Sequence, residues 1–443
     1  MDLTARPTIA VLGASGLIGQ GVAEALGRDG YPVVAVARRF TAAQRAAFGA
    51  ASIQAPFVGF DAARLAGLFE GVDIVLNCVG VLQDGPRGGT SDAHAGFVGR
   101  LIAALRAQPR PILLLHLSIP GDAAADATAF ARSKRAADGL IAASGLPHAI
   151  LRPGFVIAPA AFGGSALVRG LAALPLALDA RNEAAPFAVT ALADLAATVC
   201  TAARLWRDGW PGGGFVWDVM ARRTPSVGEV IDAVRARFGG PRPRLRLPAS
   251  LLTLGALAGD AVAWLGWSPP VRTTALAELR RGVAGDPAGW IAATGLEPAT
   301  LEAALAAVPA SVQEIWFARL FFAKPLLIGV LAAFWIGSGL VALGPGWPAA
   351  VSILTQRSVP PDWTVGLALV TALADVAIGV GLAVRRTCRS ALVAGVALSL
   401  GYLVAATVVA PDLWFDPLGP LLKIVPIMAL MLVALAILPE RWG

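Results

Sequence analysis

The chain has 443 residues, of which 56% are hydrophobic and 15% are charged. Charged residues make up about 25% of an ordinary soluble domain, so this composition excludes a disordered chain and argues against a wholly soluble one. The net charge is +7, but the basic residues are scattered rather than gathered on one predicted face, and we expect no nucleic-acid partner. The three cysteines and three histidines lack the spacing of zinc ligands, so neither a metal site nor a disulfide framework is expected.

Strands and helices alternate from residue 8 to about residue 315. The apolar runs expected to be strands are Thr8–Leu12, Val33–Ala37, Ile74–Asn77, Ile112–Leu117 and Ala149–Leu151. Helical patterns lie between them at Gly19–Leu26, Ala62–Phe69, Phe97–Ala107 and Ser133–Ala143. Such alternation predicts an α/β fold with a parallel sheet and right-handed crossovers. We expect residues 1–160 to form its core and residues 161–316 to complete the domain with a smaller lobe.

The smaller lobe carries weaker signals. Ser226 can cap a helix that runs to about residue 237, and Gly239-Gly240 can end it. Arg242–Leu247 then has the alternation of a short strand. Ala249–Trp267 is apolar, but Asp260 and several glycines interrupt it. We therefore interpret this segment as a buried or interfacial helix of the lobe rather than as a membrane span.

Long apolar runs follow from about residue 325. They are Pro325–Leu343, Trp363–Val384, Ser390–Ala410 and Leu418–Leu438. About 20 apolar residues in a helix span the ~30 Å hydrocarbon core of a bilayer, so we expect residues 317–443 to form an all-α bundle of four transmembrane helices. A very buried soluble bundle is the disfavoured alternative, because four such runs follow one another.

Basic residues set the expected orientation of these spans, because loops rich in arginine and lysine stay in the cytoplasm. One side of the bundle carries Arg319, Lys324, Arg385, Arg386, Arg389 and Arg441. The other side carries Arg357, Asp412 and Asp416. We therefore expect a multi-pass protein of the inner (cytoplasmic) membrane, with both termini and the α/β domain in the cytoplasm.

A glycine-rich turn follows the first predicted strand and opens the first helix. Its sequence is Gly13-Ala14-Ser15-Gly16-Leu17-Ile18-Gly19. Glycines at these positions allow a tight turn and the close approach of a pyrophosphate, which then lies on the N-terminus of the helix. Ser15 can add a hydroxyl donor. The alternative is a glycine-rich turn without a ligand, which the strand–turn–helix context disfavours.

Residues at the ends of the next strands refine the cofactor prediction. Arg38 and Arg39 follow the second strand, where an arginine accommodates the 2′-phosphate of NADP and an acidic residue would bind the ribose of NAD. The sequence therefore favours NADP(H), although the two arginines could simply be solvated. Asp61 either accepts from the adenine amino group or only caps the following helix. Asn77 and Gly80 lie at the end of the predicted strand Ile74–Asn77, at the edge where the cofactor is expected.

These motifs resemble the short-chain dehydrogenase/reductase superfamily in its atypical, NmrA-like and complex-I-subunit-like branch. The resemblance covers residues 8 to about 305 and rests on GASGLIG, Asp61, NCVG at 77–80, Ser118, FARSK at 130–134 and LRPGFV at 151–156. Residues 317–443 resemble the DoxX-like membrane domain through the span with Asp375 and the stretch PDLWFDPLGPLLK at 411–423. The resemblance implies a Rossmann-type sheet that binds a dinucleotide, but it implies no particular substrate.

The catalytic motif of the superfamily is incomplete in this chain. The family delivers a proton through a Tyr-x-x-x-Lys pair, and its lysine lowers the pKa of the tyrosine and holds the ribose. Lys134 matches the lysine, but Phe130 stands where the tyrosine would be. Ser118 matches the active-site serine. The chain's two tyrosines, Tyr31 and Tyr402, are not placed to substitute.

Three functions are compatible with these features. We favour a membrane-anchored NADP(H)-dependent oxidoreductase that acts on a lipophilic substrate, such as a quinone or an isoprenoid-like carbonyl. The second is a non-catalytic NADP(H)-binding subunit of a membrane complex, or a redox sensor. The third is a transport or scaffold protein. Asp375, near the middle of the second span, is either a hydrogen-bonded packing group or a proton or quinone site. Lys423 is the one cation within the predicted depth of the spans.

Overall fold

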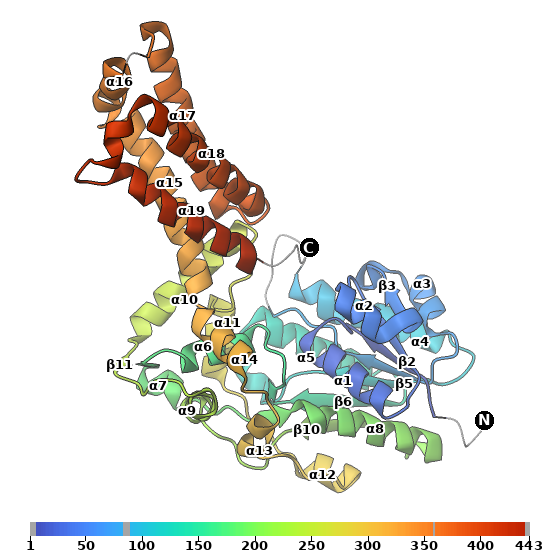
Figure 1. Ribbon diagram of the computed structural model, residues 1–443. Coiled ribbons are helices and arrows are strands. Elements are labelled where there is room, and N and C mark those ends of the chain that lie inside the picture. Colours follow the sequence, from blue (N-terminus) through green and yellow to red (C-terminus); the bar gives the residue numbers. More distant parts are fainter. Residues whose placement is uncertain (1–5, 83–88, 358, 439–443) are drawn as a thin grey trace. The chain divides into compact units, whose positions relative to one another are not determined.

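The computed structural model describes residues 6–82, 89–357 and 359–438. The chain forms two compact units (Figure 1). The first comprises Met1–Asp260 and Pro269–Ala318, and the second comprises Ala261–Ser268 and Arg319–Gly443. Arg441, one of the basic residues used to predict the orientation of the spans, lies outside the described residues.

A seven-stranded parallel sheet lies at the centre of the first unit, in the order β10-β6-β5-β4-β1-β2-β3. The strands are β1 (Ile9–Leu12), β2 (Val33–Ala37), β3 (Ser52–Gln54), β4 (Ile74–Asn77), β5 (Leu113–Leu117), β6 (His148–Pro153) and β10 (Gly214–Val219). The predicted Rossmann-type sheet is confirmed. Two of its strands, β3 and β10, were not among those expected from the sequence.

Helices cover both faces of the sheet (Figure 1). Because side chains alternate along a strand, Ile9 and Val11 of β1 join one apolar cluster, whereas Ala10 and Leu12 join another. Residues of α1 (Leu17–Arg28), α8 (Leu192–Gly209) and α12 (Ala288–Thr294) complete the first cluster. Residues of α3 (Ala62–Ala66), α4 (Phe97–Arg106) and α5 (Ala129–Ala142) complete the second. The predicted helices are therefore present, and α2 (Ala42–Phe48) follows β2.

The smaller lobe has its own apolar core. Its elements are β7 (Phe155–Ile157), α6 (Gly164–Ala172), β8 (Leu176–Ala177), α7 (Ala180–Glu183), β9 (Val189–Ala191), α9 (Val227–Phe238), β11 (Leu245–Arg246), α11 (Thr273–Arg281), α13 (Leu301–Ala306) and α14 (Val312–Leu320). Ser226 caps α9 and Gly239 ends it with φ 64°, as predicted. The strand expected at Arg242–Leu247 shortens to β11, which pairs with β8. The apolar helix α10 (Ala249–Trp264) runs from the first unit into the second.

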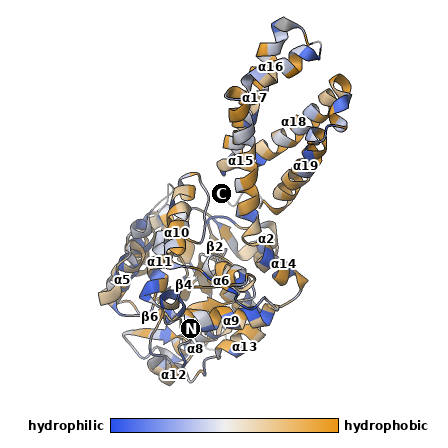
Figure 2. Cartoon of the chain, turned by 90° about the vertical axis from the view of Figure 1, so that its left-hand side faces the viewer, coloured by the Kyte–Doolittle hydropathy of each residue, from blue (hydrophilic) through white to orange (hydrophobic). Residues whose placement is uncertain are grey.

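Among its described residues, the second unit contains four helices that are long and apolar enough to cross a membrane. They are α15 (Ala323–Leu343), α17 (Pro361–Ala383), α18 (Cys388–Val409) and α19 (Pro420–Ile437). A shorter helix, α16 (Trp347–Gln356), lies between the first two and was not expected from the sequence. Figure 2 shows that hydrophobic residues make up most of these helices. Large side chains such as Val370, Val404 and Leu432 are more than half exposed, as lipid-facing positions are, and the four spans indicate a membrane protein.

Candidate functional site

The glycine-rich turn has the geometry of an anion cradle. Gly13 follows β1 with φ +84°, a conformation that favours glycine. A Cβ atom at Gly19 would lie 2.3 Å from the carbonyl oxygen of Gly13, so this position also requires glycine. Gly16 stands at the N-cap of α1 and has no side chain with which to cap it. The first amide groups of α1 are thus presented to a ligand, and the helix dipole favours an anion there.

Ser15 and the two arginines flank this turn. Ser15 is partly exposed, and its carbonyl oxygen accepts a bond of 3.3 Å from Gln44 Nε2, which ties the turn to α2. Arg38 and Arg39 follow β2 directly, and both side chains are exposed. Because β2 pairs with β1 in parallel, the arginines and the glycine turn lie at the same edge of the sheet. This is the arrangement expected for a 2′-phosphate contact.

Asp61 caps a helix, which was one of two roles predicted for it; the other was a contact with the adenine amino group. It stands at the N-cap of α3, and its Oδ1 accepts a bond of 2.8 Å from the backbone N–H of Arg64. The structure therefore accounts for Asp61 without a ligand. Its contact with adenine stays a prediction.

Asn77 shapes the end of β4 rather than pointing into open space. It is only 1% exposed. Its Oδ1 accepts from the backbone N–H of Val79 at 3.0 Å, and its Nδ2 lies 3.0 Å from Nδ1 of His116 on β5. Because the amide oxygen is occupied by an N–H group, the amide nitrogen faces the imidazole and donates to it. His116 therefore carries its proton on Nε2. Burial, with a smaller contribution from Lys134, lowers the pKa of His116 well below its usual range, so the ring is neutral.

Lys134 lies at the centre of the candidate site. It is 5% exposed, and its Nζ donates to the carbonyl oxygens of Leu117 at 2.9 Å and Val79 at 3.2 Å. The ammonium group thus bridges the ends of β5 and β4. Burial lowers its pKa to about 8, against a smaller raising effect of Asp138. Gly80 lies beside this ammonium group, since a Cβ atom at Gly80 would be 3.6 Å from Nζ.

Phe130 precedes Lys134 by four residues, which places the two side chains on one face of α5. A partly buried phenyl ring therefore lies on the face of α5 that also carries Lys134. His94 packs edge-on against it, with ring centroids 5.7 Å apart. Nε2 of His94 accepts from the backbone N–H of Val81 at 3.1 Å, and its Nδ1 lies 2.8 Å from the Ser133 hydroxyl. The histidine holds the loop after β4 against α5.

Ser118, His116 and Asp138 form a buried polar group beside Lys134. His116 Nε2 and Asp138 Oδ1 are 4.0 Å apart. Among the residues that the structure describes, neither of these atoms nor the Ser118 hydroxyl has a partner within hydrogen-bond geometry. Burial raises the pKa of Asp138, while the nearby Ser118 hydroxyl and Arg152 act in the opposite direction. The Ser118 hydroxyl is thus buried beside the Asp138 carboxyl group, directly after β5.

Three residues of this site were not predicted: His94, His116 and Asp138. Each comes from a different segment, and none stands in a recognisable spacing with another. Asp138 follows Lys134 by four residues, and that helical spacing was the one available signal.

The two membrane-domain candidates differ in their surroundings. Asp375 on α17 is 8% exposed. Its Oδ1 accepts from the Tyr402 hydroxyl at 2.9 Å, and its Oδ2 accepts from the Ser338 hydroxyl at 3.0 Å. This carboxyl group links α17 to α18 and α15. Lys423 is exposed on α19. The hydrogen bonds of Asp375 are made with the two hydroxyl groups and not with Lys423.

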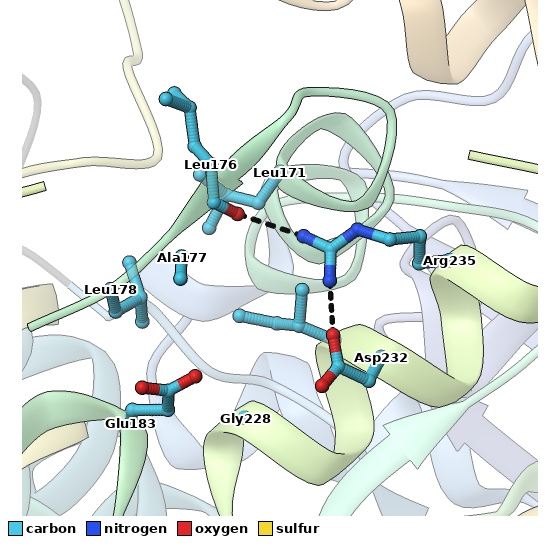
Figure 3. Close-up of a pocket in the computed structure, with 9 residues that line it drawn as sticks. Leu171, Leu176, Ala177, Leu178, Glu183, Gly228, Asp232 and Arg235 are labelled. Carbon is cyan, nitrogen blue, oxygen red and sulfur yellow. Dashed lines mark hydrogen bonds and ion pairs between the residues drawn. The ribbon is translucent and has the colours of Figure 1, made fainter. Parts of the chain in front are cut away.

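A pocket in the smaller lobe is too small for a substrate (Figure 3). Arg235 donates to the carbonyl oxygen of Leu176 at 2.8 Å and to the Asp232 carboxylate. The volume enclosed beside them is about 10 Å³, which is room for about one water molecule. The arginine here fastens α9 to β8 and has a structural role.

Each of the two parts of the chain matches a known protein family. Residues 13–194 match a family described as NAD(P)H-binding, and residues 332–432 match the DoxX-like family. No curated protein matches the sequence.

Solved structures resemble the α/β domain at low sequence identity. UDP-glucuronic acid 4-epimerase from Bacillus cereus, with UDP-glucuronic acid and NAD, has a TM-score of 0.52 and 14% identity, over 70% of this chain and 99% of its own. The human epimerase family protein SDR39U1, with NADPH, has a TM-score of 0.51 and 18% identity, over 67% of this chain and 97% of its own. The Bordetella bronchiseptica enzyme WbmH, with NAD⁺, has a TM-score of 0.50 and 16% identity, over 71% and 98%. At such identities the likeness concerns the fold.

Fold and site together define a dinucleotide-binding domain built on a Rossmann-type parallel sheet. In this chain an NAD(P)H-binding domain at the N-terminus is joined to a DoxX-like membrane domain at the C-terminus. The residues present fit the dinucleotide, because the turn requires glycine at positions 13 and 19 and Lys134 lies at the same edge of the sheet.

Proposed function

We propose that the protein is a membrane-anchored NADP(H)-dependent oxidoreductase that reduces a lipophilic carbonyl compound, such as a quinone or an isoprenoid-like molecule. The observation that carries the proposal is the union of an intact dinucleotide cradle with four apolar helices in one chain. A substrate that partitions into the bilayer would be available to a domain held beside it. Reduction of a quinone would consume one hydride from NADPH and one proton, and it would release NADP⁺ and hydroquinone.

Arg38 and Arg39 support the choice of NADP(H) over NAD(H). Both are exposed directly after β2, at the edge where a 2′-phosphate would lie. No carboxylate stands at either position, so the ribose contact typical of NAD would be missing. Cofactors of both kinds occur in the similar solved structures, so the preference rests on these two arginines.

The chain's own residues have distinct roles in this proposal. The amide groups at the start of α1 bind the pyrophosphate, and Lys134 binds the ribose hydroxyl groups while its other bonds fix it to β4 and β5. Ser118 donates to the substrate oxygen. The bound nicotinamide supplies the hydride. Phe130 cannot supply a proton, so the proton comes from Ser118, from a bound water or from the substrate.

Phe130 also favours the second candidate function. A protein that keeps the cofactor cradle and Lys134 but lacks the acid can hold NADP(H) without turnover. It would then be a structural or assembly subunit of a membrane complex, or a redox sensor. Its partners would be other membrane proteins as well as the lipid bilayer.

The proposed location is the cytoplasmic membrane, with both termini and the NAD(P)H-binding domain inside. Basic residues at one end of the bundle support this orientation. An ion pair between Arg357 and Asp412 joins the two loops assigned to the opposite side, which is consistent with helices that alternate in direction.

Measurement of NADPH oxidation in gently solubilised protein separates the two candidates. Turnover with a short-chain quinone or an activated carbonyl would support the oxidoreductase. Tight, stoichiometric retention of NADP(H) with no turnover on either substrate would support the structural subunit. Mass spectrometry of co-purified cofactor and lipid would identify the natural ligands.

A further inference from the structure

Helix α10 has two apolar faces: one packs on protein, and the other is exposed. Leu252, Ala256, Gly259 and Ala263 recur at spacings of three or four residues and are buried or partly buried, so they form the face that packs on protein. The opposite face holds large apolar side chains that are exposed. These are Leu251, Leu254, Leu257, Val262 and Trp264.

The exposure of this face is large for a water-soluble surface. Leu254 is 62% exposed and Trp264 is 83% exposed. A contiguous row of such side chains in water marks an interaction site. The single charge of the helix, Asp260, is absent from this face: its carboxylate accepts from Arg272 Nε at 2.7 Å and from the Thr273 hydroxyl at 2.6 Å. The large side chains of the exposed face are therefore all apolar, and its polar residues are confined to Ser250 and Thr253 in the first turns.

The end of α10 belongs to the membrane unit. Residues Ala261–Ser268 form a compact unit with the spans. The backbone N–H of Arg385 donates to the carbonyl oxygen of Leu265 at 2.9 Å, and Trp267 Nε1 donates to the carbonyl oxygen of Ala383 at 2.7 Å. The Arg385 guanidinium also lies 5.4 Å from the centre of the Trp267 ring.

These contacts fix the depth of the helix end relative to the spans. Ala383 is the last residue of α17, and Arg385 stands in the turn before α18. The ends of two membrane-spanning helices mark the boundary between acyl chains and headgroups, where tryptophan and arginine are enriched. The segment from Leu265 to Trp267 is therefore held at that boundary.

We infer that α10 is an interfacial helix whose exposed face is embedded in one leaflet of the phospholipid bilayer. Burial of these exposed apolar side chains among the acyl chains removes them from water and is therefore favourable. Leu252, on the opposite face, packs on the apolar core of the smaller lobe. The inference depends on the membrane domain and does not depend on catalysis.

Site-directed fluorescence in lipid nanodiscs tests the inference on the full chain. In a background with Cys78→Ser, Cys200→Ser and Cys388→Ala, the variants Leu254→Cys and Leu257→Cys would carry a polarity-sensitive fluorophore. Val370→Cys, on a span, provides the lipid-exposed control. Leu140→Cys, an exposed leucine of α5, provides the matched water-exposed control.

Nitroxide groups attached to lipid acyl chains then report contact with the bilayer. We expect lipids labelled near the headgroup to remove most of the emission at positions 254 and 257, and lipids labelled near the chain end to act mainly at position 370. Position 140 should be unaffected. Quenching at 254 and 257 no greater than at 140 would overturn the inference. Blue-shifted emission without lipid quenching would also overturn it, because a protein surface would then cover the face.

A second measurement needs no substitution. Phospholipids with a photoreactive diazirine near the headgroup should attach to the peptide that contains residues 249–264 of the unmodified chain in nanodiscs. Adducts confined to the four spans would contradict the inference even if the cysteine variants failed to fold.

Discussion

Replacement of Arg38 by aspartate should reverse the cofactor preference. A hydrogen bond between arginine and a phosphate is worth about 1.5–3 kcal/mol, and the lower half of that range applies because Arg38 is exposed. A carboxylate about 5 Å from a doubly charged phosphate adds about 1.5 kcal/mol of repulsion at the dielectric constant of water. The sum is about 3–4 kcal/mol, so NADPH should bind about 10²–10³-fold more weakly, since 1.4 kcal/mol is a factor of ten.

The same substitution should strengthen the binding of NADH. Aspartate at position 38 could accept from the ribose hydroxyl groups, and one such bond is worth about 1 kcal/mol. That corresponds to roughly fivefold tighter binding. The two effects have opposite signs, so they cannot arise from a general loss of folding.

Titration calorimetry of the detergent-solubilised protein with each cofactor measures both effects. Arg28→Asp is the matched control, because Arg28 is an exposed arginine at the far end of α1, about 16 Å along the helix from the glycine turn. It makes the same change in net charge. Equal affinity of the unmodified protein for NADPH and NADH would refute the assignment, as would identical losses in Arg38→Asp and Arg28→Asp.

Further predictions concern Lys134, Asp375 and the topology. Because the pKa of Lys134 is lowered to about 8, the ammonium group is present below that pH and lost above it. The affinity for NADP(H) measured by calorimetry should therefore fall as the pH rises through about 8. The Lys134→Ala variant should bind NADP(H) weakly, with an affinity that does not change across this pH range. Asparagine at position 375 can accept from one of the two hydroxyl groups and donate to the other, so Asp375→Asn should unfold within about 1 kcal/mol of the unmodified protein. Asp375→Leu should lose about 1–3 kcal/mol, because it leaves both hydroxyl groups unpaired. A stable but inactive Asp375→Asn would show instead that this carboxyl group titrates during function. In intact cells, an impermeant thiol reagent should label Arg357→Cys but not Arg386→Cys, and the reverse pattern would refute the proposed topology.

Local patterns in the sequence predicted most of the α/β fold and the four spans. Buried parallel strands such as β4 and β5 are continuous apolar runs, and the spans are long enough that length alone identifies them. By contrast β10, with the sequence GFVWDV, mixes exposed and buried positions. It joins the sheet through its pairing with β6, a contact between residues distant in the chain. Such pairing leaves little trace in a local pattern.

The glycine turn that forms the cofactor cradle could be predicted from the sequence, but the buried polar contacts at the ends of β4 and β5 could not. The glycine turn is one contiguous motif whose backbone geometry requires its residue types. Asn77 and His116 are 39 residues apart and meet because β4 and β5 are neighbours. In the membrane domain, Lys423 was the evident cation for Asp375, but the hydrogen bonds of Asp375 run to Tyr402 and Ser338. These contacts depend on how the helices pack against one another, and the spacing of residues in a single sequence does not predict that packing.

Restoring the missing acid provides the clearest separation of the two candidate functions. Phe130 is one turn of α5 before Lys134, so Phe130→Tyr would place a hydroxyl group on the same face as the ammonium. A positioned general acid is worth roughly 10²–10⁴-fold in rate. If the protein is an oxidoreductase that works without this acid, single-turnover NADPH oxidation by an activated carbonyl should accelerate within that range, while cofactor affinity stays unchanged.

The structural subunit makes the opposite prediction for the same variant. With no substrate beside the nicotinamide, the added hydroxyl group would have no effect on NADPH oxidation. Lys134→Ala should weaken cofactor binding in either case, because it removes the ribose contact, and so it verifies that the assay reports on this site. Ser118→Ala completes the set: under the oxidoreductase proposal it should slow the unmodified protein. A fast rate in the unmodified protein that Ser118→Ala leaves intact would show that neither Ser118 nor the Phe130 position governs the proton, and that the acid must be sought elsewhere.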